Sequence, residues 1–89
     1  MRRPAYTRAF ERDLKRMFRR GKNSARIKAV MLDLIEGRPL EPRLRDHFLS
    51  NNFAGRRECH IEPDWLLIYK LEPEEIIFER TGTHADLFD

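Results

Sequence analysis

Cysteine is scarce in this chain of 89 residues, and it has no long apolar run. The one cysteine, Cys59, has no partner within the chain, so nothing here requires an oxidising compartment. The longest apolar run is Trp65–Tyr69, far short of the ~20 residues needed to span a bilayer. No apolar stretch follows the N-terminal arginines, so we expect no secretory leader. We therefore expect a soluble, cytoplasmic protein with no membrane partner.

The length predicts one domain over residues 1–89, without internal repeats. A chain of this size buries only roughly 60–65% of its unfolded surface, so its core must be compact and simple.

Acidic residues are rare in the first third of the chain. Residues 1–28 hold eleven Lys and Arg against Glu11 and Asp13, whereas residues 29–89 hold seven against thirteen acids. A polycationic segment of this kind favours phosphate backbones without reading their sequence. A solvated helix face or a surface for an acidic protein partner would have the same composition.

Two amphipathic helices are predicted in this basic third. Pro4 limits residues 2–6 to an edge strand or an extended lead-in. Thr7 is a candidate N-cap for a helix over about residues 8–20, and Gly21 suits its C-terminal end. The apolar stripe of this helix is Phe10, Leu14, Met17 and Phe18.

The second helix is expected over about residues 25–36. Asn23 or Ser24 can cap it, and Gly37 followed by Pro39 ends it. The two helices then form an αα-hairpin. The apolar stripe of the second helix is Ile27, Val30, Met31, Leu34 and Ile35.

Residues 40–46 are predicted as a loop because of Pro39 and Pro42, with Leu44 and Phe48–Leu49 returning to the core. His47 lies in this region, and residues 50–55 form a further connection.

Three strands follow. Residues 56–62 alternate, which places Cys59 and Ile61 towards the helices and Glu58, His60 and Glu62 on an open face. Pro63-Asp64 turns the chain into the buried strand 65–69, and residues 76–81 form the next strand. The expected fold class is α+β, a twisted antiparallel sheet backed by two N-terminal helices.

Few side chains can carry chemistry. They are three histidines, a carboxylate at a hairpin tip and an arginine at a strand end: His47, His60, His84, Asp64 and Arg80. Three histidines and an aspartate could bind zinc, although no histidine pair has the short spacing of helical zinc motifs. Arg80 would also place positive charge beside the cation.

Metal-independent RNA cleavage suits the same residues. Histidine can serve as base towards the ribose 2′-hydroxyl and as acid towards the leaving 5′-oxygen. The guanidinium of Arg80 could stabilise the phosphorane, unless it only pairs with Glu79 or Glu58. Phe88 and Trp65 could stack on a splayed base, although core packing is the stronger reading for Trp65.

Two blocks of this sequence, residues 60–70 (HIEPDWLLIYK) and 78–88 (FERTGTHADLF), closely resemble YafQ-type toxins of the RelE/ParE superfamily. The resemblance extends to the Arg45-Asp46-His47 triplet and the two-helix half. It implies a RelE-like fold that ends in a short helical turn, and cleavage of mRNA in the ribosomal A site without a cofactor or metal. It also implies a cognate antitoxin as protein partner. The loop 49–54 departs from the family pattern, which bears on codon preference.

The resemblance assigns roles to individual residues. The catalytic set that it implies is His47, His60, Asp64, Arg80, His84 and Phe88. The surface that meets ribosomal RNA or mRNA is then Arg12, Lys15, Arg16, Arg19, Arg20 and Lys22, with Trp65 near the site. Two alternatives remain on the same fold: a ParE-like toxin that binds a topoisomerase without catalysis, and a degenerate toxin that only binds its antitoxin.

Overall fold

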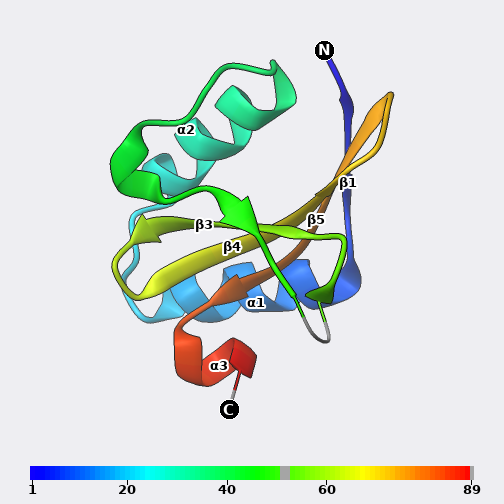
Figure 1. Cartoon of the computed structure of the whole chain (residues 1–89). Helices are drawn as coiled ribbons and strands as arrows, with labels where there is room; N and C mark the ends of the chain where they lie inside the picture. The colour runs from blue at the N-terminus through cyan, green and yellow to red at the C-terminus, as the bar shows by residue number, and fades with distance from the viewer. Residues whose placement is uncertain (51–52, 89) are drawn as a thin grey trace.

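The structure is a computed structural model that describes residues 1–50 and 53–88. Its fold is α+β, a sheet with helices against it (Figure 1). In chain order the elements are β1 (Arg3–Tyr6), α1 (Arg8–Arg19), α2 (Ser24–Ile35), the 3₁₀ turn η1 (Pro42–Leu44), β2 (His47–Phe48), β3 (Arg57–Glu62), β4 (Trp65–Leu71), β5 (Glu75–Gly82) and α3 (His84–Phe88).

The sheet has the strand order β1-β5-β4-β3-β2. The predicted antiparallel meander of β3, β4 and β5 is confirmed, and β2 adds to it antiparallel to β3. The expectation of a wholly antiparallel sheet is wrong, because β1 pairs parallel to β5, with Pro4 opposite Ile76. A hairpin turn sets the direction of a neighbouring strand, but β1 reaches β5 from the other end of the chain, so no turn sets its direction.

Both long helices begin at the predicted caps. The Thr7 hydroxyl accepts a hydrogen bond from the Phe10 N–H at 2.9 Å and donates one to the Glu79 carbonyl at 2.8 Å, which ties the start of α1 to β5. The Asn23 side chain accepts from the Ala25 N–H at 2.9 Å and caps α2. Gly21 follows the C-terminal end of α1 and adopts a left-handed conformation, with φ of 87°, as expected of a glycine at the end of a helix.

The main core lies between the helices and one face of the sheet. Phe10 and Met17 of α1 and Ile27 of α2 are buried against Cys59 and Phe78 of the sheet. Leu44 of η1 joins this core, as predicted. Phe18 does not: it is 37% exposed, because it lies at the margin of the α1 stripe rather than over the sheet.

A smaller apolar cluster covers the opposite face of the sheet. Leu66 and Ile68 of β4 pack there against Leu87 of α3, with the half-buried Leu49 and Phe53. Because both faces of β4 are covered, its residues Trp65–Tyr69 are all buried, which accounts for the continuous apolar run. The predicted return of Phe48 to the core is wrong, since Phe48 is 70% exposed and lies under the Arg57 guanidinium.

The β3–β4 hairpin departs from strict alternation at its tip, where the register shifts between His60 and Glu62. Cys59 and Ile61 face the helices, as expected. Glu62 was expected beside His60, but it pairs with Lys22 at 2.7 Å and Arg26 at 3.2 Å on the helix side. Burial raises the pKa of Cys59 to about 12, which makes this thiol inert at neutral pH.

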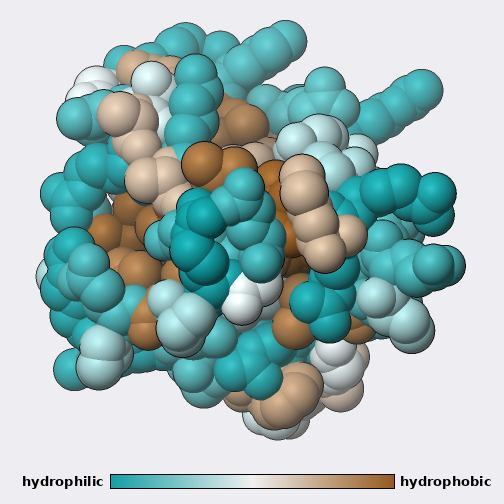
Figure 2. Space-filling view, turned by 90° about the horizontal axis from the view of Figure 1, so that it is seen from above, coloured by the Kyte–Doolittle hydropathy of each residue, from teal (hydrophilic) through white to brown (hydrophobic). Residues whose placement is uncertain are grey.

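Charged side chains dominate the exterior. The face in Figure 2 is mostly hydrophilic, and hydrophobic residues show in the hollows between the charged groups. None of the helices in the described part of the chain is long and apolar enough to cross a membrane. Residues 51–52 of the predicted connection 50–55 lie outside the described residues.

Candidate active site

Three histidines come together on the sheet face that carries the smaller apolar cluster. The ring centroids of His47 on β2 and His60 on β3 are 6.2 Å apart, and those of His60 and His84 on α3 are 5.8 Å apart. The Phe88 ring continues the line at 6.4 Å from His84. We call His47, His60 and His84 the histidine row. Two of its members come from neighbouring strands and the third from the helix after β5, so only the tertiary fold unites them.

Glu58 lies beneath two members of this row. Its side chain was predicted on the open face, but the residue is only 5% exposed. One carboxylate oxygen, Oε2, is 3.2 Å from Nε2 of His47 and 3.5 Å from Nε2 of His60. The sequence analysis missed this residue as part of the site. Its alternation with His60 was the available signal, because it placed both on one face.

The other ring nitrogens of these two histidines face backbone carbonyls. Nδ1 of His47 is 2.5 Å from the Arg45 carbonyl, and Nδ1 of His60 is 3.3 Å from the Pro63 carbonyl. A carbonyl or carboxylate oxygen only accepts a hydrogen bond. Glu58 and the two backbone carbonyls thus hold both rings in place.

The strand that carries His47 is anchored by the preceding residue. The Asp46 carboxylate accepts a hydrogen bond from the buried Tyr69 hydroxyl and another from Arg57 Nε at 3.2 Å. A two-residue strand has few ladder hydrogen bonds of its own. These side-chain contacts fix β2, and with it His47, against β3 and β4.

Asp64 holds the third histidine. Its Oδ1 accepts from the His84 backbone N–H at 2.9 Å and lies 2.6 Å from Nδ1 of the same residue. These bonds, the backbone one first, lower the pKa of Asp64 below its usual range, so the carboxylate is ionised at neutral pH. With Nδ1 engaged, Nε2 of His84 is the nitrogen left for proton transfer. The turn between β3 and β4 thus positions α3.

Helix α3 is further held at its start and along its inner side. The Asp86 carboxylate accepts a hydrogen bond from the Thr83 N–H at 2.9 Å, and the Asp86 N–H donates one to the Thr83 hydroxyl at 3.1 Å. Leu87 is buried in the smaller cluster, while Phe88 is 46% exposed and meets Phe53 edge to face. The exposed Phe88 ring can offer a surface to a base.

Arg80 lies on the α1 side of this arrangement. Its Nε and Nη2 donate to the buried Asp13 carboxylate at 2.6 and 3.3 Å, and Asp13 also accepts from the Thr81 N–H at 3.1 Å. The bonds to Asp13 raise the pKa of Arg80, which keeps the guanidinium charged. The pairings with Glu79 or Glu58 that the sequence analysis considered are not formed. Within the described residues Arg80 makes no hydrogen bond to the histidine row.

The basic residues that were predicted to contact RNA differ in whether they have an acidic partner. Arg12, Lys15 and Arg19 are exposed, and with Arg16 and Arg80 they line a shallow depression along α1. The other predicted RNA contacts have acidic partners: Arg16 pairs with Asp13, Arg20 with Asp86 and Lys22 with Glu62. The sequence analysis could not see these pairs, because most of them join residues far apart in the chain.

Trp65 does not belong to the site surface. It is fully buried in the main core, and its Nε1 donates to the Thr81 hydroxyl at 3.0 Å. Its ring is therefore closed to a base, and the predicted RNA contact is wrong. Across residues 1–50 and 53–88, no three His, Cys, Asp or Glu side chains gather in an arrangement that could hold a metal ion.

Comparisons with known proteins give consistent results. Residues 2–89 match a family described as "Bacterial toxin of type II toxin-antitoxin system, YafQ". An "mRNA interferase toxin YafQ" from Escherichia coli (strain B / BL21-DE3) is 44% identical over 84 residues, covering 93% of this chain and 91% of the relative. The crystal structure of YafQ from E. coli strain BL21(DE3) matches with a TM-score of 0.95 at 41% identity, over 100% of both chains. A crystal structure of the E. coli DinJ-YafQ complex matches with a TM-score of 0.93 at 42% identity, again over 100% of both chains.

Proposed function

The chain belongs to the YafQ family of toxins from type II toxin-antitoxin systems, and from this membership we propose that it cuts mRNA on the ribosome with the histidine row as its active site. As a member of this family it is a toxin and an endoribonuclease of the mRNA interferase type. The matches support this reading and not the topoisomerase-binding or degenerate toxin. The proposal assigns the activity to one domain, residues 1–89, in the cytoplasm.

The observation that carries the proposal is the spacing of the row. Its neighbouring rings are 6.2 and 5.8 Å apart, and an exposed aromatic ring follows at 6.4 Å. A phosphodiester placed against the row would have imidazoles on both sides and a base-stacking surface at one end. Proton donors and acceptors on two sides of a phosphate are what cleavage by the neighbouring 2′-hydroxyl requires.

The reaction is a transesterification. One imidazole takes the proton of the ribose 2′-hydroxyl, whose oxygen attacks phosphorus. The bond from phosphorus to the 5′-oxygen breaks, and a second imidazole gives that oxygen a proton. The products are a 2′,3′-cyclic phosphate and a 5′-hydroxyl. His84, held by Asp64, acts from one side through Nε2, and His47 and His60 act from the other.

Arg80 supplies positive charge in this scheme. Asp13 fixes the guanidinium through Nε and Nη2, which leaves Nη1 to donate to a phosphate oxygen. The exposed cations along α1, Arg12, Lys15 and Arg19, extend this positive surface for the RNA backbone. Such contacts weaken steeply as the salt concentration rises.

Two partners follow from the proposed function. The E. coli relative was crystallised as a DinJ-YafQ toxin-antitoxin complex, and we infer a cognate antitoxin for this chain as well. The ribosome, with its bound mRNA, is the second partner. No cofactor or metal is required for the proton transfers assigned to the histidines.

Primer extension on a defined mRNA tests the proposal. The wild-type protein should cut the mRNA within codons in a reconstituted translation reaction. When ribosome–mRNA complexes are formed first and the toxin is then added in excess, EDTA should reduce cleavage only as far as it damages the ribosome. Naked mRNA should stay intact. His60→Ala and His84→Ala should each slow cleavage roughly 10²–10⁴-fold. Wild-type rates in both variants would refute the site, and no cleavage by folded wild type would refute the activity.

A further inference from the structure

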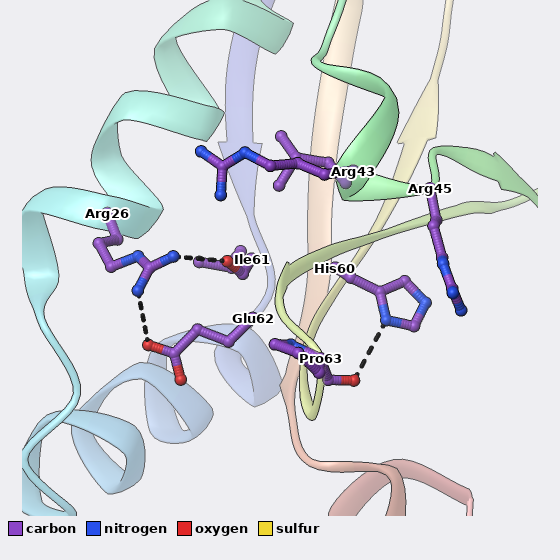
Figure 3. A pocket seen from close by; sticks show the side chains of 8 residues that line it. Arg26, Arg43, Arg45, His60, Ile61, Glu62 and Pro63 are labelled. Carbon is purple, nitrogen blue, oxygen red and sulfur yellow. Dashed lines mark hydrogen bonds and ion pairs between the residues drawn. The ribbon is translucent and has the colours of Figure 1, made fainter.

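A second basic feature adjoins the histidine row. It is a pocket of about 290 Å³ between α2, η1 and the tip of β3, and its walls include His60 and Ile61 of β3 (Figure 3). Its basic lining residues are Arg26, Arg43 and Arg45. We call this feature the arginine pocket. His60 belongs both to the histidine row and to this pocket, so the two features are continuous.

The buried residue Leu44 fixes the positions of Arg43 and Arg45, which flank it in the η1 region. Leu44 is 7% exposed and anchors η1 in the main core, whereas Arg43 and Arg45 on either side of it are exposed. Figure 3 shows the Arg43 side chain extending towards α2 and Arg45 extending past His60. The pocket thus receives cations from both sides of one anchored turn.

Arg45 is tied to the active site through its backbone. It adopts a left-handed conformation, with φ of 50°, and its carbonyl faces Nδ1 of His47. This conformation is uncommon for a residue other than glycine or asparagine. The Arg45 guanidinium makes no hydrogen bond or ion pair with any other residue that the structure describes. It is a charged group held beside the histidine row without an internal partner there.

The third arginine forms the opposite wall. Arg26 donates to Glu62 at 3.2 Å and to the Ile61 carbonyl at 3.3 Å, so its guanidinium is held in place (Figure 3). Glu62 also accepts from Lys22 at 2.7 Å, and its one negative charge is shared between two cations. Arg43 pairs with Glu41, but both side chains are about two-thirds exposed, so the pair is open to exchange. The pocket is therefore positively charged overall.

From this arrangement we propose that the arginine pocket binds the backbone phosphate of the mRNA next to the one that is cleaved. The inference rests on the proposed function, because the histidine row must hold the scissile phosphate. A strand that leaves the row past His60 enters the pocket, where guanidinium groups can bind phosphate oxygens. Contacts from arginines to phosphate groups position the backbone and carry no base-edge selectivity. The pocket thus sets the position of the strand.

A synthetic mRNA with one neutral methylphosphonate tests the proposal. The modification is placed at the phosphate on the 5′ or the 3′ side of the cleaved bond, in separate substrates, and cleavage is followed on reconstituted ribosomes. At one of the two positions it should slow the wild-type protein roughly tenfold. Arg43→Gln and Arg45→Asn should each slow cleavage of the unmodified mRNA by a similar factor, with less salt dependence. Asparagine is chosen because it tolerates the left-handed conformation.

The decisive comparison combines the two changes. In the Arg43→Gln, Arg45→Asn double variant the methylphosphonate should cause little further loss, because the two exposed arginines are gone and Arg26 stays bonded to Glu62 and the Ile61 carbonyl. The proposal would be overturned if the rate losses from the substitutions and from the methylphosphonate multiplied in the double variant. It would also be overturned if the wild-type protein cut both modified substrates as fast as the unmodified mRNA. Arg3→Gln removes an exposed guanidinium from β1, at the opposite edge of the sheet, and should stay fully sensitive to the modification. If wild type fails to cut the unmodified mRNA, the proposed function itself fails.

Discussion

Arg20 and Asp86 form a two-point ion pair between the end of α1 and helix α3. Nη1 of Arg20 lies 2.7 Å from Oδ2 of Asp86, and Nη2 lies 3.1 Å from Oδ1. The two residues are 66 positions apart in the chain. Because α3 carries His84 and Phe88, this pair connects the N-terminal helix to the geometry of the proposed active site.

We predict that Arg20→Gln and Asp86→Asn each lower the cleavage rate about three- to tenfold by loosening α3. A helix of five residues cannot hold its own shape, so external contacts decide where His84 points. Both variants should keep the wild-type dependence on salt, since a residue that positions α3 contacts no phosphate. Rates measured between low and moderate salt check this.

Arg19→Gln is the matched control for that experiment. Arg19 is the neighbouring exposed arginine at the end of α1, and we propose that it contacts RNA. Its loss should reduce the salt slope by about one, as expected for one phosphate contact. If Arg20→Gln instead reduced the slope as Arg19→Gln does, Arg20 would contact RNA as the sequence analysis expected.

The same ion pair predicts a pH dependence of stability. The Arg20 guanidinium first, and the Thr83 N–H next, hold the pKa of Asp86 well below its usual range. A lowered pKa in the folded state stabilises the protein above the unfolded value, about 3.9, and this contribution is lost as the pH falls towards the folded pKa. Asp86→Asn should therefore be less stable than wild type at neutral pH, with a gap that narrows below about pH 4. Urea unfolding at several pH values measures this gap, and a constant gap down to pH 2 would contradict the prediction.

Trp65→Phe should change stability and leave the chemistry intact. The substitution removes the hydrogen bond from Nε1 to the Thr81 hydroxyl and part of a fully buried ring, at a cost of about 1–3 kcal/mol. The Thr81 hydroxyl still donates to the Leu66 carbonyl, so β4 and β5 stay paired. Thermal unfolding and cleavage assays well below the transition separate the two effects.

Phe88→Ala provides the contrast, because Phe88 is half exposed beside His84. It should slow cleavage roughly tenfold while changing stability little. A folded Trp65→Phe protein that lost as much activity as Phe88→Ala would restore Trp65 as a base contact.

Local patterns in the sequence predicted the elements whose causes are themselves local. Thr7 and Asn23 are capping residues, and the Pro63-Asp64 turn joins two apolar strands, so the helices and the hairpin follow from neighbouring residues. Phe18 shows the limit of such patterns. Helical spacing places it in the apolar stripe of α1, but does not show how much of that stripe the sheet covers. The parallel direction of β1 depends on the whole chain returning to β5.

The candidate site shows the same division. The motif was enough to predict His60, Asp64 and His84 as site residues. It was not enough to predict which residues hold the site in place. Asp13 meets Arg80 across 67 positions of the chain, and Arg20 meets Asp86 across 66. Such pairs depend on where α1 packs against the end of β5. Surface charge counts alone therefore overestimated how many cations are free to meet RNA.

Glu58 gives the most direct test of how the histidine row works. Its buried carboxylate contacts Nε2 of both His47 and His60, and no other residue does so among those the structure describes. Glu58→Gln keeps the shape of the side chain but removes the negative charge that lies beside the two imidazole rings. We predict that the cleavage rate on saturated ribosomes falls roughly tenfold or more, with little change in the ribosome concentration that gives half the maximal rate.

Two further variants separate this role from a general loss of structure. Glu58→Asp keeps the negative charge on a shorter side chain and should therefore cleave faster than Glu58→Gln. This order is expected even though aspartate fills the space of the glutamate side chain less well than glutamine does. Glu72→Gln removes a carboxylate that pairs with Lys70 near the far end of the β4–β5 hairpin, and its rate should equal that of wild type. If Glu58→Gln cleaved normally while Glu58→Asp was slow, packing rather than charge would explain the residue. The expected order, with Asp above Gln, requires that the carboxylate acts on the histidines electrostatically.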